Sequence, residues 1–402
     1  MTQATQGANG GVRWVLLAGV WLIYFCFGMT VASIAPLVTP IGRDLGISNA
    51  VMGVILGAWP LVYIVAALPA GMLLDRIGVR AGLLLAALFM TLSLAARGLA
   101  QEPWQLLLAV GLFGIGGPMI SIGAPKAIAR LFPDAARGTA MGLYMTGPAF
   151  GGIWALSLTN SVLLPAAGGE WRLVFAMHAI VTLLSGAVWL ALSALPAART
   201  SGWDDEPGKK FDMPAFVEIL RLTEVRLILL LAIGIFFFNH GLNNWLPEIL
   251  RQKGFGATEA GWLASVPTAV GILGALVIPR LATPPRRILI MSGLLVAACA
   301  ASLLLQAAHE GLLLPGLILQ GIARSSLMTV AILLLLDSRG VPQDRLGLAG
   351  GLFFTVAEVG GVLGPLTFGV VSDFSGGFAL PLAMLSLLCL ALLALIARLA
   401  RH

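Results

Sequence analysis

The stretch GMLLDRIGVR, Gly71–Arg80, joins two long apolar runs through one acid and two arginines. An Asp followed by an Arg is costly in hydrocarbon, so Asp75, Arg76 and Arg80 are expected at a membrane–water interface. Gly78 permits a tight reversal there, because glycine adopts backbone conformations that other residues avoid. The stretch therefore predicts two membrane-spanning helices joined by a short charged turn.

The composition of the whole chain supports the same class of protein. Hydrophobic residues make up 59% of the 402 residues and charged residues only 10%, whereas soluble domains carry about 25% charged residues. The three cysteines lie far apart within apolar runs, which argues against a disulfide framework or a metal site. The cations are scattered singly at the ends of apolar runs, so the net charge of +6 is interpreted as membrane topology and not as a nucleic-acid-binding surface.

Apolar runs long enough to cross a bilayer, about 20 residues, recur along the chain. The first half contains such runs at about 14–37, 51–74, 81–100, 104–131, 138–164 and 172–196. The second half contains them at about 226–249, 259–281, 287–307, 311–336, 346–371 and 377–397. The sequence predicts an all-α polytopic membrane protein with twelve transmembrane helices, organised as an N-terminal bundle (1–196), a cytoplasmic linker with a short interfacial helix (197–225) and a C-terminal bundle (226–402).

The distribution of Lys and Arg predicts the orientation in the membrane. Of the 24 such residues, eighteen fall on one side of the predicted spans and five on the other, while Arg324 lies inside a span. Cytoplasmic loops carry the excess of positive charge. Both termini and the Asp75 turn are therefore expected in the cytoplasm, and the chain in a bacterial inner membrane.

The two halves resemble each other, as expected of repeats around a central site. Gly114–Gly116 in the fourth span matches Gly321–Ala323 in the tenth. Together with the Asp75 turn and the segment Phe132–Gly138, this pattern resembles the major facilitator superfamily over essentially the whole chain, although Val79 stands where that family usually has a cation. The resemblance implies two bundles that rock about a midplane cavity lined by spans one, four, seven and ten.

Shorter motifs suggest a subgroup. Asn244–Pro247, Ala260–Leu263 and Ala124–Lys126 are most similar to the cyanate and nitroimidazole transporter group, but they identify no solute. The run Gly147–Gly152 is similar to a motif of proton-linked drug exporters, although Val110 stands where those exporters commonly have an Arg. Close helix packing is the stronger interpretation of that run. An exporter of small amphiphilic drugs is the alternative to a carrier of small anionic or polar solutes.

Arg324 is the main candidate for solute binding. A guanidinium at the centre of a span costs about 2.5–3.5 kcal/mol on insertion scales, so it must face protein or a water-filled cavity. Because Arg keeps its charge and presents a fork of donors, it suits carboxylates and small oxyanions. The alternative is a structural pair with a neighbouring helix. Since span ten lines the cavity in the resembled fold, we favour an anchor for an anion.

Polar side chains in three other spans are further candidates for solute binding. Asn239 and Asn243 lie one turn apart in span seven, and His240 lies beside them. Tyr24 in span one and Ser121 in span four offer hydroxyl groups. The alternative is hydrogen bonding between helices, which contributes about 0.6 kcal/mol per contact in membranes.

Glu358, in span eleven, is the candidate for proton coupling. Burial favours the neutral form of a carboxyl, whereas a facing Arg324 favours the ionised form. A solute could displace such a pair, or the pair could simply hold two helices together. Span eleven is usually peripheral in the resembled fold, which favours the structural or gating role. Trp59 is interpreted as a packing residue.

Asp75, Arg76, Arg80 and Arg137 are assigned to gating and not to solute binding. In the resembled family, the Asp of this turn sits at the start of span eleven, here near Leu346, and latches the bundles. The physical basis is that a helix N-terminus stabilises an anion by about 0.3–1 kcal/mol.

The remaining functional classes are less favoured. The four histidines share no metal-ligand spacing, and no phosphate-binding Gly-Lys-Ser/Thr loop is present. An enzyme and direct ATP use are therefore not expected. A receptor that binds without transporting is disfavoured because the longest loop has only about 30 residues. We predict a monomeric secondary transporter without cofactors, acting by alternating access with a small solute and protons in the lipid bilayer.

Overall fold

The computed structural model describes residues 3–132, 135–195, 218–307, 309–338, 341 and 345–401, almost all of them helical. The longer helices of the first half are α1 (Gln3–Ala32), α2 (Val38–Leu45), α3 (Asn49–Leu99), α4 (Pro103–Leu131), α5 (Arg137–Leu158) and α7 (Trp171–Ala194). Those of the second half are α10 (Thr223–Gln252), α11 (Ala257–Leu281), α12 (Arg287–Gln306), α13 (Leu313–Leu336), α14 (Leu346–Ser375) and α15 (Ala379–Leu399). Short turns of helix connect some of them: Ala35–Leu37, Thr159–Leu163, Leu164–Ala166, Pro284–Arg286 and Glu310–Leu312.

The turn predicted at Gly78 explains the number of spans. Eleven of the described helical segments are long and apolar enough to cross a membrane. One of them, α3, has 51 residues, more than twice the length of about 20 that a bilayer requires. Its backbone leaves helical geometry at Gly78, where φ is 81°, in the region that favours glycine. The helix α3 therefore contains two spans, and the predicted twelve-helix fold is confirmed.

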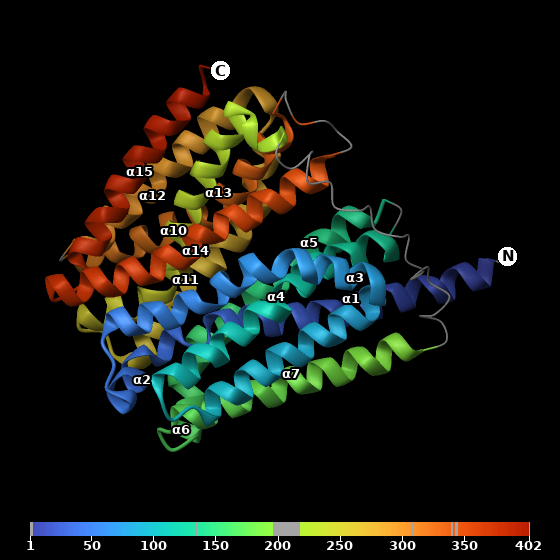
Figure 1. Ribbon diagram of the computed structural model, residues 1–402, viewed down its shortest axis with the longest axis horizontal. Coiled ribbons are helices and arrows are strands. Elements are labelled where there is room, and N and C mark those ends of the chain that lie inside the picture. Colours follow the sequence, from blue (N-terminus) through green and yellow to red (C-terminus); the bar gives the residue numbers. More distant parts are fainter. Residues whose placement is uncertain are drawn as a thin grey trace. The chain divides into compact units, whose positions relative to one another are not determined.

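The described parts of Met1–Leu37 and Val65–Lys209 form one compact unit. Within it, α1 and α5 are in extensive contact (Figure 1). A side chain at Gly151 would overlap the backbone oxygen of Phe25, and one at Gly28 would overlap that of Pro148. The predicted role of the Gly147–Gly152 run in close helix packing is confirmed, since only glycine lets these backbones approach so closely.

Arg97 stabilises the end of α1 from inside this unit. The sequence places it among the loop cations, but its side chain is only 1% exposed. Its Nη1 donates hydrogen bonds to the carbonyl oxygen of Thr30, at 3.1 Å, and to Oγ of Ser33, at 2.9 Å. Because the last carbonyls of a helix lack intrahelical partners, a guanidinium at this point satisfies them and interacts favourably with the helix dipole.

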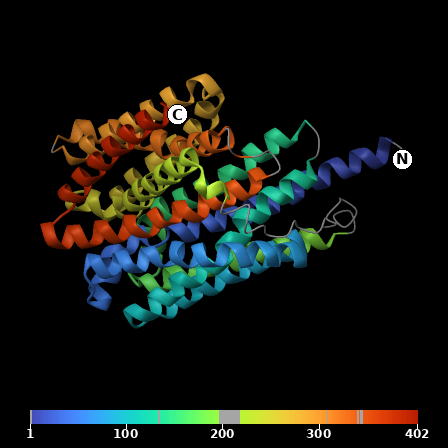
Figure 2. The same cartoon turned by 45° about the horizontal axis from the view of Figure 1, so that its top comes forward.

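The second compact unit consists of Val38–Ile64 and the described residues from Glu218 onwards. The helices α10 and α14 lie side by side in it (Figures 1 and 2). The segment Val38–Ile64 belongs to the first half of the sequence, yet it packs against α14: a Cβ at Gly53 would lie 2.6 Å from the backbone oxygen of Pro365. The predicted linker lies largely within residues 196–217, outside the described residues.

Candidate functional site

Arg324, on α13, has a neutral side-chain partner. Its Nη1 donates a hydrogen bond to Oγ1 of Thr268 on α11, at 2.8 Å, and its side chain is partly exposed. The two helices approach closely beside it, because a Cβ at Gly321 would lie 2.5 Å from the backbone oxygen of Pro267. No carboxylate among the described residues forms an ion pair with Arg324. Among the described residues, the guanidinium of Arg324 therefore has a neutral hydroxyl and no carboxylate as its side-chain partner.

Polar residues of α10 adjoin Arg324. Nδ2 of Asn239 donates to the backbone oxygen of Arg324 at 3.4 Å, while its Oδ1 is buried without a hydrogen-bond partner. Asn243, one turn further along α10, is partly exposed. Asn244 donates back to the carbonyl oxygen of His240 at 2.8 Å, within its own helix. The structure thus brings the side chain of Asn239 to the backbone of Arg324, and a common solute site for the two side chains stays a prediction.

Glu358 lies against α10 and faces His240. The distance between Oε2 of Glu358 and Nε2 of His240 is 3.9 Å, and the two side chains are only 8% and 17% exposed. Oε2 of Glu358 has no hydrogen-bond partner. The static pair with Arg324, weighed as an alternative from the sequence, is absent from the described residues.

Two aromatic rings stack on His240. The ring of Phe236, on α10, lies 5.5 Å away at 16°, and that of Trp59, on α3, lies 5.4 Å away at 29°. Trp59 is buried, with 7% of its surface exposed. The interpretation of Trp59 as a packing residue did not include its contact with the imidazole of His240. No local pattern could have revealed it, because the two helices are remote in sequence.

The predicted site residues of the first half lie in the other unit. Tyr24 stacks on Tyr144 with ring centroids 5.5 Å apart at 16°. Oγ of Ser121 donates to the carbonyl oxygen of Gly117 at 3.1 Å, within α4. Their part in solute binding stays a prediction.

The predicted gating residues surround the Gly78 turn and the start of α5. Asp75 forms an ion pair with Lys126 on α4, within its own unit. Nε of Arg80 donates to Oγ of Ser193 on α7 at 3.0 Å. The side chains of Arg76 and Arg137 are exposed. The latch at the start of α14 stays a prediction.

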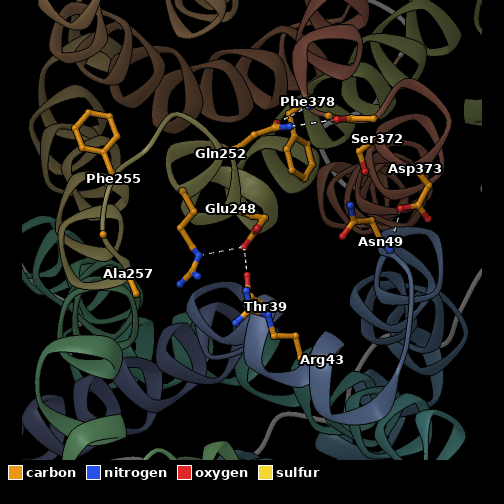
Figure 3. Close-up of a pocket in the computed structure, with 14 residues that line it drawn as sticks. Thr39, Arg43, Asn49, Glu248, Gln252, Phe255, Ala257, Ser372, Asp373 and Phe378 are labelled. Atoms are coloured by element: carbon orange, nitrogen blue, oxygen red, sulfur yellow. Dashed lines mark hydrogen bonds and ion pairs between the residues drawn. The ribbon is translucent and has the colours of Figure 1, made fainter.

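A cavity of about 540 Å³ opens where α2, α10 and α14 have their ends (Figure 3). On one wall, Oγ1 of Thr39 donates to Oε2 of Glu248 at 2.5 Å. On the other, one carboxylate oxygen of Asp373 accepts from the backbone nitrogen of Asn49 at 3.1 Å (Figure 3). The second carboxylate oxygen accepts from the backbone nitrogen of Ala50 at 2.8 Å. No sequence motif pointed to these residues. Thr39 and Glu248 join α2 to α10, and Asp373 joins the end of α14 to the start of α3.

No group of three His, Cys, Asp or Glu side chains suited to a metal occurs among the described residues. The apolar helices, with α3 counted as two spans, define a polytopic membrane protein. The family model of the Major Facilitator Superfamily matches residues 20–365, and the chain belongs to this family.

Individual relatives are identical to this chain at a quarter of the aligned positions or fewer. A "Quinolone resistance transporter" of Acinetobacter baumannii is 25% identical, covering 86% of this chain and 84% of its own. A "Probable galactarate/D-glucarate transporter" of Bacillus subtilis is 24% identical, covering 92% of this chain and 88% of its own. The crystal structure of a bacterial homologue of the human lysosomal transporter Spinster, in an inward-facing and unoccupied conformation, has a TM-score of 0.75 at 19% identity and covers 99% of this chain and 97% of its own.

Proposed function

We propose that this protein is a secondary active transporter that moves a small anionic solute, most simply a carboxylate, by alternating access coupled to protons. The observation that carries the proposal is the guanidinium of Arg324, whose one side-chain partner among the described residues is the hydroxyl of Thr268. A charge left unpaired inside a membrane protein is costly, and membrane proteins keep such charges mainly at solute and ion pathways. A bound carboxylate would pair with it.

The relative named for galactarate and D-glucarate transport supports a carboxylate, since both compounds are dicarboxylic sugar acids. The cyanate and nitroimidazole subgroup suggested by Asn244–Pro247 is a narrower hypothesis. Cyanate is also an anion, so the same anchor would serve it. We keep the sugar-acid class as the first choice because that relative covers most of this chain.

An exporter of small amphiphilic drugs is the second candidate, and the relative named for quinolone resistance favours it. The surroundings of Glu358 fit this alternative. A lipophilic cation would bind an acid beside aromatic rings, and His240, next to Glu358, is stacked by Trp59 and Phe236. The two functions differ in which charged residue contacts the solute: Arg324 for an anion, Glu358 for a cation.

The proposal includes a location and an orientation. We propose an inner-membrane protein with both termini in the cytoplasm, and the bias of Lys and Arg toward one side of the spans supports this orientation. We propose that the transporter acts as a monomer, because each bundle contributes residues to one central pathway in the resembled fold.

Thermal unfolding of the purified protein tests the function. D-glucarate, galactarate and cyanate are added in parallel with the uncharged polyol galactitol and a cationic quinolone ester. We expect at least one of the anions to raise the melting temperature. The Arg324→Ala variant should lose the response, with at least a tenfold weaker affinity, because a charge-assisted hydrogen bond contributes about 1.5–3 kcal/mol.

Arg286→Ala removes an exposed arginine and serves as the control. It should respond like the wild type. An anion response that survives in Arg324→Ala would contradict the anchor. A response to the cationic ester alone, lost in Glu358→Gln, would establish the exporter instead.

A further inference from the structure

We propose that His240 and Glu358 share the transported proton, and that the strength of the stacking between Trp59 and the imidazole depends on whether this proton is bound. This inference rests on the proton coupling proposed above and names the site of that coupling. It assigns Trp59 as a positioning residue of the transport cycle.

The geometry of the pair supports a shared proton. Nε2 of His240 and Oε2 of Glu358 are 3.9 Å apart, and Oε2 has no other partner. Gly361 leaves room for both groups, because a Cβ at that position would lie 3.2 Å from Nδ1 of His240 and would overlap Oε2 of Glu358. A proton on the imidazole would convert a loose contact between two buried polar groups into an ion pair.

The charges around His240 link the proton to the solute. Glu358 on α14 faces the imidazole, and α13 approaches the preceding residue of α10, because Asn239 donates to the backbone oxygen of Arg324. A nearby carboxylate favours a protonated imidazole, whereas a nearby guanidinium opposes it. The rings of Trp59 on α3 and Phe236 on α10 stack on the imidazole, and Tyr63 lies against Trp59. Thr268 on α11 is hydrogen-bonded to Arg324. A carboxylate bound at Arg324 would cancel the opposing charge and so favour protonation of His240. By linkage, protonation would strengthen binding of the carboxylate by the same factor.

Trp59 connects this proton to movement. An indole face attracts a cation more strongly than a neutral ring, so the stack on His240 strengthens when the imidazole is protonated. Trp59 belongs to Val38–Ile64, which packs against α14 through Gly53 and Gly57. Protonation would therefore hold this segment against the C-terminal helices, and loss of the proton would release it.

Tryptophan fluorescence of the purified protein tests the inference without any solute. Subtracting the pH titration of Trp59→Phe from that of the wild type isolates the emission of Trp59. Because imidazolium quenches indole more strongly than imidazole does, we expect this emission to fall through one transition as the pH is lowered. The transition should vanish when the same subtraction is made in a His240→Gln background. In a Glu358→Gln background it should move to lower pH by one unit or more, since the carboxylate that favours the imidazolium is gone.

Two pairs of variants control the measurement. Trp262, on α11, is 50% exposed, and the difference spectrum of Trp262→Phe should show no such transition. Gly361→Ala should displace the transition, whereas Gly351→Ala, on the same helix with open space at its Cβ, should leave it unchanged. A transition that persists unaltered without His240, or one that is absent from the wild type, would overturn the inference.

The outcome separates this inference from the proposed function. If the protein accumulates a solute in response to a pH gradient but the Trp59 emission does not change with pH, the role of Trp59 is wrong and the proposed transport function stands. If the Trp59 emission changes with pH but the protein accumulates no solute in response to a pH gradient, the proposed proton coupling is wrong. The contact between His240 and Trp59 would then be a pH-sensitive stack without a role in coupling.

Discussion

Arg324 and Glu358, the two side chains that the sequence marks as buried charges, have different surroundings. Arg324 bonds to a hydroxyl and stays available for an anion. Glu358 faces an imidazole that can itself take up a proton. A direct ion pair between the two would have neutralised both and left neither free for a solute or a proton. The absence of such a pair is consistent with the separate roles that we propose for them.

For single side chains, we predict that Glu358→Gln uncouples solute transport from proton movement. In proteoliposomes with an inward pH gradient, the variant should lose accumulation of the transported anion by more than tenfold and keep solute exchange at zero gradient. The reason is that an amide fills the space of the carboxyl but cannot exchange the proton. Uptake and counterflow of the radiolabelled anion measure the two activities.

The matched control for this experiment is Glu259→Gln, which removes an exposed acid from α11. It should accumulate solute normally. Accumulation by Glu358→Gln at the wild-type level would show that the proton is carried elsewhere.

The helix α14 approaches the backbones of two neighbouring helices of the second unit very closely. A side chain at Gly360 would overlap the backbone oxygen of Ile233 on α10, and one at Gly369 would overlap that of Asn49 on α3. Glycine at these positions lets α14 contact both neighbours at backbone distance. Asp373 reinforces the second contact by accepting hydrogen bonds at the N-terminus of α3. This helix therefore joins α10 and the start of α3 within its unit.

We predict that Gly369→Val separates the start of α3 from the end of α14. Spin labels on the exposed positions Val51 and Phe374, in a background without native cysteines, report the distance between these two ends. The wild type should show a predominant short distance, and the variant should shift most of the population to a longer one. Gly350→Val, where a Cβ meets open space, should behave as the wild type. An unchanged distance in Gly369→Val would refute this account of the contact.

At the scale of the whole molecule, the Asp75 turn is the predicted device for alternation. In the described state Asp75 pairs with Lys126 inside its own unit. We predict that Asp75→Ala slows turnover several-fold and changes solute affinity by less than a factor of two, because the latch acts on the exchange between conformations and not on the solute. Transport rates in proteoliposomes and binding to the purified protein separate these quantities.

Glu170→Ala is the control for this prediction, since Glu170 is an exposed acid that forms no side-chain cap at the start of α7. It should leave turnover unchanged. A large loss of affinity in Asp75→Ala, with turnover preserved at saturation, would argue against a latch.

The sequence by itself determined the membrane class, the twelve spans, the turn at Gly78 and the presence of Arg324 and Glu358 inside the bilayer. These features follow from local properties: the length of an apolar run, the cost of burying a charge, and the conformational freedom of glycine. Each of these features can be recognised from a single stretch of the sequence.

Only the tertiary structure decided which groups meet. It pairs Glu358 with His240, stacks Trp59 on that imidazole, and places Val38–Ile64 among the helices of the second half. Such contacts depend on how each helix is rotated and how closely its neighbours approach. Residues remote in the chain become neighbours through the packing of whole helices, and no local pattern of residue types records that packing.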